Sequence, residues 1–146
     1  MAKISIAEFT NKLSEIMPVI TREFIKHQTP ELERLNVTMP QFVVMDIVHR
    51  NGESNMTDLA HSISVTTAAM TGIVDRLVKN KYVSRSSDAK DRRIIRIYLT
   101  EKGVKVFKKT LCLRKQIFTK IYGILSERER EEYINILMHI RDYLKE

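Results

Sequence analysis

The chain has 146 residues, a net charge of +7 and a sequence pI of about 9.6. Its length fits one domain with one hydrophobic core, and its 43% of hydrophobic residues excludes a disordered chain. No apolar run approaches the roughly 18–20 residues that a membrane span needs, and the N-terminus lacks the apolar core of a signal peptide. The single cysteine, Cys112, excludes an internal disulfide framework. We therefore expect a soluble, cytoplasmic protein without a membrane partner.

The positive charge is concentrated in the middle of the chain. Residues 75–96 contain eight basic and three acidic residues, and residues 97–122 contain seven basic residues and one acidic residue. The segments before and after this block each have a net charge of −2. Such a block attracts a phosphate backbone, although a solvated lysine-rich surface would have the same composition.

In chain order, the first expected element is an amphipathic helix over residues 5–28, which could kink or break at Pro18. Residues 31–36 form a connector with at most one helical turn. A largely apolar helix should begin after Thr38, its N-cap, and end near Arg50. This second helix should be central to the core because it is apolar on most sides.

Two helices joined by a tight turn should follow, which is the arrangement of a helix-turn-helix. The first would run from Asp58 to residue 62 or 63 with Thr57 as its cap, and the second from Thr66, its cap, to about Asn80. The second helix would bury a stripe made of Met70, Ile73, Val74 and Leu77. Its outward face would then carry small and hydroxyl-bearing side chains that allow close approach to a major groove, namely Thr67, Ala68, Thr71 and Gly72. Helix capping alone is the alternative role for Thr66 and Thr67.

The periodicity then changes to that of strands, at residues 82–85 and 93–99, with a polar turn between them. A hairpin directly after a helix-turn-helix is a wing. Its arginines suit a narrow and negative minor groove, although a solvated basic turn is the alternative. An acidic residue in such a turn would weaken DNA binding unless it is paired. We therefore expect Asp91 to pair with Arg93 or Arg76.

Two long helices should complete the chain. Thr100 would cap the first, which runs to about residue 123, and Ser126 with Glu129 forms a capping box for the last, which ends near Lys145. A compact monomer of this size does not need long amphipathic helices at both ends, so we expect them to pack against a second copy. The expected architecture is one mainly α (α+β) domain over residues 1–146, a winged helix-turn-helix lobe over 38–100 and dimerisation helices over 1–29 and 101–146.

Three motifs in this order resemble the MarR family of winged-helix transcriptional regulators: Asp58-Leu59-Ala60 followed by residues 64–78, Asp91-Arg92-Arg93, and residues 98–103. The resemblance implies an obligate homodimer that binds a pseudo-palindromic operator in double-stranded DNA, with repression as the favoured outcome. It also implies that Arg93 and Arg92 enter the minor groove while Asp91 braces the wing. The DNA-binding residues expected are Thr66, Thr67, Ala68, Thr71, Gly72, Arg76, Lys90, Asp91, Arg92 and Arg93.

Members of this family often respond to small aromatic or phenolic acids bound between the dimerisation helices and the DNA-binding lobe. The resemblance suggests Phe24, His27, Phe42 and Met45 as the lining of such a site, although an apolar residue at helical spacing more often belongs to the plain core. Some relatives sense oxidants through a cysteine near the N-terminus, whereas Cys112 lies in a late helix beside lysines. We favour a structural role for Cys112. The family usually has glycine before the first strand, where this chain has Lys81-Tyr82. The sequence therefore departs from the family pattern at this turn.

No enzyme motif is present in the sequence. The chain has no Gly-rich phosphate loop, no nucleophile elbow and no Cys-x-x-Cys, and its four histidines are scattered. We expect no catalytic residue, no metal and no cofactor. Two other functions stay open: a part of a larger enzyme such as a methyltransferase, and a sequence-indifferent DNA-binding protein. The latter would bind random and operator DNA alike, whereas a regulator would discriminate by roughly 10³ or more.

Overall fold

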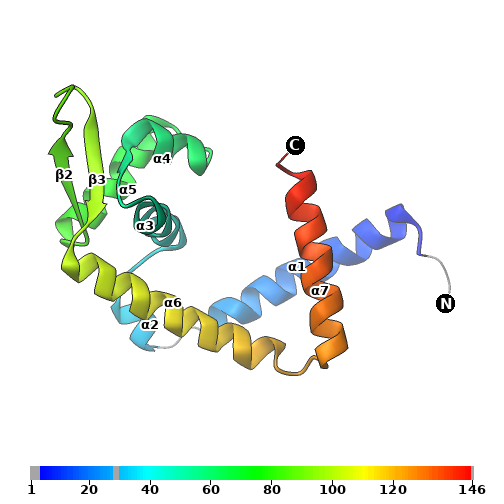
Figure 1. Ribbon diagram of the computed structural model, residues 1–146. Coiled ribbons are helices and arrows are strands. Elements are labelled where there is room, and N and C mark those ends of the chain that lie inside the picture. The colour runs from blue at the N-terminus through cyan, green and yellow to red at the C-terminus, as the bar shows by residue number, and fades with distance from the viewer. Residues whose placement is uncertain (1–3, 28–29, 146) are drawn as a thin grey trace. The chain divides into compact units, whose positions relative to one another are not determined.

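The computed structural model describes residues 4–27 and 30–145, with the expected helices and hairpin strands in the expected order and one further short strand that was not expected (Figure 1). The expected end of the first helix at residues 28 and 29 lies outside the described residues. The elements are α1 (Ile6–Lys26), α2 (Pro30–Arg34), α3 (Met39–Asn51), β1 (Ser54–Asn55), α4 (Met56–Ser62), α5 (Thr67–Lys79), β2 (Val83–Ser87), β3 (Ile95–Leu99), α6 (Glu101–Tyr122) and α7 (Glu127–Tyr143). The expected mainly helical fold with a helix-turn-helix and a hairpin is confirmed.

The chain forms two compact units. The described residues of 29–113 make the first, here called the central unit, and those of 1–28 and 114–146 make the second, here called the terminal-helix unit. The central unit contains the helix-turn-helix and the hairpin, so it contains the expected reading surface.

Helix α3 supplies the centre of the core in the central unit. Its residues Val44, Met45 and Val48 are fully buried, which agrees with the expected apolar character of this helix. Helices α4 and α5 add fully buried residues to the same cluster, namely Leu59, Met70, Val74 and Leu77. Burial of one stripe of α5 leaves its opposite face exposed, because side chains three and four positions apart share one side of a helix.

A three-stranded antiparallel sheet, in the order β1-β3-β2, completes the central unit. Ile97, in the middle of β3, is fully buried and pairs with Ser54 on one side and Arg85 on the other. The ends of β2 and β3 lie within two residues of the strand ends expected from the sequence. Strand β3 begins only at Ile95, because Ile94 still belongs to the wing turn and donates its backbone N–H to the carbonyl of Asp91 at 2.9 Å.

Side-chain caps fix most helix starts at the expected residues. Thr38 with Gln41, and Ser126 with Glu129, form the two capping boxes, and Thr66 caps α5. Thr57 was wrongly expected to cap α4. That helix begins two residues earlier, at Met56, and Asn55 caps it by accepting the backbone N–H of Asp58 at 2.8 Å. Pairing of β1 with β3 fixes Asn55 in an extended conformation, and a two-residue strand leaves no periodic signal in the sequence.

The junction between α5, β2 and α6 explains the Leu-Thr-x-x-Gly motif at residues 99–103. Lys81 adopts the left-handed conformation with φ of 61°, so the turn that usually contains glycine is made here by lysine. The hydroxyl of Thr100 donates to the carbonyl of Lys81 at 2.7 Å and accepts the backbone N–H of Gly103 at 2.9 Å. A Cβ added at Gly103 would lie 1.8 Å from the carbonyl oxygen of Tyr82, so only glycine fits there.

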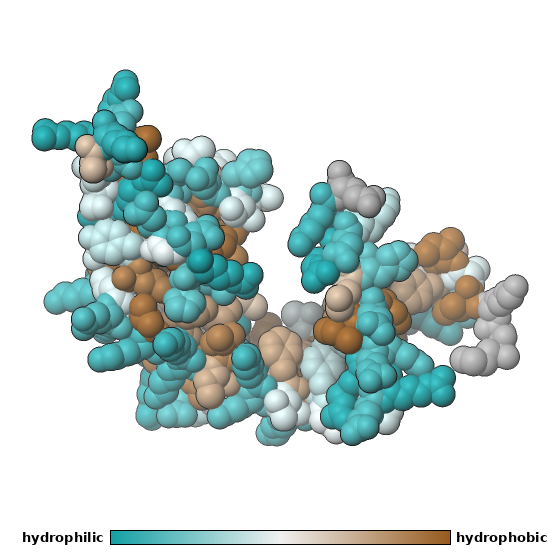
Figure 2. All heavy atoms as spheres, in the orientation of Figure 1, coloured by the Kyte–Doolittle hydropathy of each residue, from teal (hydrophilic) through white to brown (hydrophobic). Residues whose placement is uncertain are grey.

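The terminal-helix unit has little core of its own. No residue of α1 or α7 is buried among the residues described, and α1 continues through Pro18 without a break. Phe24, Phe118, Tyr122 and Tyr133 form a chain of ring contacts with centroids 5.3 to 6.1 Å apart. Apolar side chains reach the surface along the terminal helices (Figure 2). None of the described helices is both long enough and apolar enough to cross a bilayer.

The substitution Gly103→Ala should lower the free energy of unfolding by about 1–3 kcal/mol, because the added methyl group must displace the backbone of Tyr82. Gly72→Ala is the matched control. No heavy atom lies within 4 Å of a Cβ built there, inside α5, so the alanine should raise the stability by about 0.5–1 kcal/mol. Denaturant titration followed by circular dichroism measures both, and equal effects of the two substitutions would contradict the close-approach argument.

Candidate nucleic-acid interface

The outward face of α5 carries the side chains expected to approach a major groove. Thr67, Ala68, Thr71 and Gly72 are exposed, and Arg76 is exposed one turn further along. Thr66 accepts the backbone N–H of Ala69 at 3.1 Å, which is its expected role as a cap. The Thr71 hydroxyl donates to the carbonyl of Thr67 at 2.9 Å, so the lone pairs of that hydroxyl still face outward as acceptors.

The wing turn lies between β2 and β3 and has a defined internal structure. Asp88 accepts the backbone N–H groups of Lys90 and Asp91 at 2.8 and 3.2 Å. Asp91 in turn binds Arg93 through both carboxylate oxygens, at 3.1 and 3.2 Å, and accepts its backbone N–H at 3.0 Å. The expected pairing of Asp91 is therefore with Arg93 and not with Arg76.

These contacts lower the pKa of both wing carboxyl groups. The backbone N–H groups of Lys90 and Asp91, followed by Arg96, hold the pKa of Asp88 below its usual value. The side chain of Arg93, followed by its backbone N–H, does the same for Asp91. Both groups are thus charged at neutral pH, and the geometry of the turn depends on their negative charge.

Three cations of the interface differ from Arg93. Within the described part of the chain, no carboxylate lies within ion-pair distance of Arg76, Lys90 or Arg92, and all three side chains are exposed. Their charge is therefore available to an anionic partner. Arg85 is instead paired with Asp75 at 2.5 Å, which ties β2 to the recognition helix α5.

Four residues that organise this surface were not among the expected site residues: Asp75, Arg85, Asp88 and Arg96. Arg85 and Asp75 also stand beside a pocket of about 400 Å³ that is lined by Met56, Thr71, Arg85, Ser86, Ser87 and Ile95. A single arginine inside each strand of the hairpin is a sequence signal that could have indicated Arg85 and Arg96. Their partners could not be found in this way, since ten and eight residues separate the two members of each pair.

The four residues expected around a ligand lie in both units. In the terminal-helix unit, Phe24 contacts Phe118 and Tyr122, and Nδ1 of His27 lies 2.8 Å from the carbonyl oxygen of Glu23. In the central unit, Phe42 stacks on Phe107 at 5.4 Å. Met45 is fully buried. The ligand site stays a prediction.

The other reactive groups of the chain form no further centre among the residues described. Cys112 is exposed on α6, and no group of three or more histidine, cysteine, aspartate or glutamate residues in that part of the chain has the arrangement of a metal site. The groups that the structure brings together on this surface are polar and cationic.

Comparison with known proteins agrees with this surface. The MarR family model matches residues 37–95. The chain is 25% identical over 131 residues to the HTH-type transcriptional regulator SarZ of Staphylococcus haemolyticus, over 90% of this chain and 88% of that protein. It is 31% identical over 98 residues to the HTH-type transcriptional repressor MdtR of Bacillus subtilis, over 67% of this chain and 63% of that protein.

Solved structures share the fold. A MarR family protein from Bacillus stearothermophilus superposes with a TM-score of 0.80 at 20% identity, over 98% of this chain and 100% of that one. A mutant of MarR from E. coli in complex with operator DNA superposes with a TM-score of 0.74 at 20% identity, over 94% and 99%. The named sequence relatives are regulators of transcription and not enzymes. Over residues 37–95, which contain the helix-turn-helix and the wing turn, the chain matches the MarR family, and its similarity is to winged-helix regulators of transcription.

Proposed function

We propose that this protein acts as a homodimer that binds a pseudo-palindromic operator and represses transcription there. The observation that carries the proposal is the exposed face of α5 beside a wing whose Arg92 has no carboxylate partner among the described residues. Repression is supported by the description of the similar protein MdtR as a repressor. Operator binding is supported by the DNA complex of E. coli MarR, which has the same fold.

In this proposal, the two parts of the central unit have different roles. Thr67, Ala68, Thr71 and Gly72 approach base edges in the major groove, where a threonine can hydrogen-bond a base or a phosphate. Arg92 and Arg93 enter the minor groove, which attracts arginine most strongly where it is narrow. Arg76 and Lys90 add phosphate contacts, and Thr66 holds the start of α5 in place.

The exposed apolar surface of the terminal-helix unit supports dimerisation through this unit. Phe9, Ile16, Ile134, Leu137 and Ile140 are each between 42 and 53% exposed, which is costly in water for so many large side chains. An open pocket of about 540 Å³ between α6 and α7 is lined by Phe118, Tyr122, Leu125, Arg130, Glu131, Tyr133, Ile134 and Leu137. Burial, followed by the hydroxyl of Tyr133, raises the pKa of Tyr122 to about 12, so its phenol is neutral in this surface. A second copy would cover these side chains.

A small aromatic or phenolic ligand that releases the protein from DNA completes the proposal. The structure of an organohalide-sensing regulator of the same fold contains 2,4-dichlorophenol, with a TM-score of 0.77. The site predicted from the family resemblance comprises Phe24, His27, Phe42 and Met45. The pocket beside Thr71 and Arg85 is the competing location, because its lining combines an arginine with the apolar side chains of Met56 and Ile95.

For the DNA-binding surface, Arg92→Ala and Arg93→Ala should each weaken operator binding by about 1–3 kcal/mol while the oligomeric state stays the same. The operator is first obtained by selection from a random DNA pool, in which half-sites should lie about 10–10.5 bp apart or a multiple of this. Arg34→Ala, an exposed arginine in α2, is the matched control and should bind normally. Equal affinity of the wild type for selected and random duplexes would instead identify a sequence-indifferent DNA-binding protein.

For the dimer, Leu137→Glu combined with Ile140→Glu should produce a folded monomer that binds a full operator at least tenfold more weakly. Both side chains are half exposed, so their loss removes little core from one chain. Asn135→Glu adds the same charge on the polar side of α7 and should leave the dimer intact. Sedimentation velocity and helical circular dichroism measure the two properties, and a double variant that stayed dimeric would exclude this interface.

For the ligand, addition of 2,4-dichlorophenol or benzoate should weaken operator binding and shift NMR resonances of Phe24, His27, Phe42 and Met45. Shifts confined to Thr71, Arg85 and Ile95 would place the ligand in the pocket beside α5 and reject the predicted site. No change in resonances or in DNA affinity at millimolar concentration would reject this class of ligand.

A further inference from the structure

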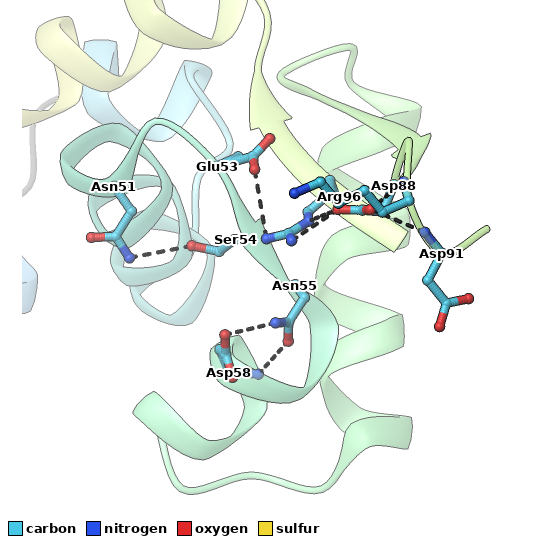
Figure 3. A network of polar contacts seen from close by, with 9 residues as sticks. Asn51, Glu53, Ser54, Asn55, Asp58, Asp88, Asp91 and Arg96 are labelled. Carbon is cyan, nitrogen blue, oxygen red and sulfur yellow. Dashed lines mark hydrogen bonds and ion pairs between the residues drawn. The ribbon is translucent and has the colours of Figure 1, made fainter. Parts of the chain in front are cut away.

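Arg96 occupies a central position in β3, between two carboxylates that come from different parts of the central unit. Its Nη2 and Nε both lie 2.9 Å from Oδ2 of Asp88, at the base of the wing turn (Figure 3). Its Nη1 lies 3.5 Å from Oε1 of Glu53, which directly precedes β1. The side chain of Arg96 is 31% exposed and that of Asp88 is 17% exposed, so this pair is better shielded from water than the other wing contacts.

The contacts of Arg96 continue to the tip of the wing. Oδ2 of Asp88 binds Arg96, whereas Oδ1 of Asp88 accepts the backbone N–H groups of Lys90 and Asp91. Asp91 then holds Arg93 through two side-chain contacts and one backbone contact. A continuous polar path therefore joins Glu53, Arg96, Asp88, Asp91 and Arg93.

The other end of this path is anchored at the start of the helix-turn-helix. The Asn51 side chain donates to the Ser54 hydroxyl at 3.4 Å, and Asn55 binds both the backbone and the carboxylate of Asp58 (Figure 3). Glu53 lies in the middle of this turn. The path thus begins at the segment that positions α4 and ends at the wing arginine.

Apart from this path, the wing turn is fixed by two backbone hydrogen bonds, from the N–H of Asp88 to the carbonyl of Ile94 at 2.8 Å and from the N–H of Ile94 to the carbonyl of Asp91 at 2.9 Å. The pairing of β2 with β3 ends at Ser87 and Ile95, and the intervening residues bury no apolar side chain. Without a hydrophobic contact, the direction of the tip depends on polar contacts of defined geometry. An arginine with a carboxylate on each side supplies such geometry, because the planar guanidinium can bind both at once.

We propose that Arg96 is a positioning residue for DNA recognition, which aligns Arg93 with the minor groove through Asp88 and Asp91 and does not itself contact DNA. The proposal rests on the wing binding DNA. Two carboxylates already occupy the guanidinium of Arg96, and a phosphate would have to displace one of them. Arg92, which is exposed and has no such partner within the described residues, is suited to direct contact.

A double-mutant cycle with the selected operator tests this proposal. Arg96→Met should weaken binding roughly 3- to 10-fold in the wild-type background and less than about 2-fold when Arg93→Ala is already present, because coupled residues are not additive. The slope of affinity against salt should not change with Arg96→Met, since no phosphate contact is lost. Glu53→Gln should act in the same direction with a smaller effect.

Arg85→Met is the matched control, because Arg85 is an ion-paired arginine on the neighbouring strand but pairs with Asp75 outside this path. Its effect should be additive with Arg93→Ala. Arg96→Lys keeps the charge and should recover part of the affinity. Faster amide hydrogen exchange at Lys90 and Asp91 in Arg96→Met, at an unchanged unfolding temperature, would show the loosened turn directly.

Additive effects of Arg96→Met and Arg93→Ala would overturn the positioning role while leaving DNA binding by the wing intact. A salt slope reduced by about one in Arg96→Met would identify Arg96 as a phosphate contact and overturn it as well. If neither Arg92→Ala nor Arg93→Ala affects binding, the wing assignment in the proposed function fails, and the positioning role fails with it.

Discussion

The pairing of β3 on both of its edges holds the central unit together. On one edge it binds β1, which leads directly into α4, and on the other it binds β2, which leaves α5. Ile97 at its centre is fully buried in the same cluster as the helix-turn-helix. Helix α4, the recognition helix α5 and the wing are therefore all connected to one strand, and its hydrogen bonds help to fix their mutual placement. Thr100 and Gly103 fix the junction between β3 and α6 in the same way. The hydroxyl of Thr100 binds the carbonyl of Tyr82, and Gly103 lets the backbone approach that carbonyl closely.

The cations of the central unit divide into those that organise the surface and those that are available to a partner. Arg85 and Arg96 are bound by carboxylates, whereas Arg76 and Arg92 are not, within the residues described. Arg93 combines both properties, because Asp91 holds it while its side chain stays 91% exposed. Exposed ion pairs contribute little to folding stability, at most about 1 kcal/mol each. In this protein, each ion pair instead restricts the orientation of a strand or a turn. Net charge alone therefore overstates how many cations can bind phosphate.

The terminal helices differ from the central unit because they carry most of the large apolar side chains that are exposed. They carry long apolar faces but bury no residue of α1 or α7 within the described chain, so packing there is limited to contacts such as those of Phe24 and Tyr133 with the rings of α6. Isolated helices are marginally stable, and most of the stability of a helix in a protein comes from burial of its apolar face. The proposed dimer would provide that burial for the terminal-helix unit.

The sequence by itself determined the elements and the local contacts of this protein. Hydrophobic periodicity gave the long helices, and the capping boxes at Thr38 and Ser126 were readable because their partners lie three residues away. The exposed face of α5 was predictable from the helical spacing of its buried residues. Arg93 was one of the two partners predicted for Asp91, and it lies only two residues away in the chain.

Only the tertiary structure decided the contacts between distant residues. The strand β1, the cap at Asn55, and the pairing of Arg96 with Glu53 and Asp88 all depend on β3 lying beside β1. No local pattern indicates such neighbours, because 43 residues separate Glu53 from Arg96 in the chain. Side chains three or four positions apart on a helix meet wherever the helix forms, whereas partners across a sheet meet only when the whole unit has folded.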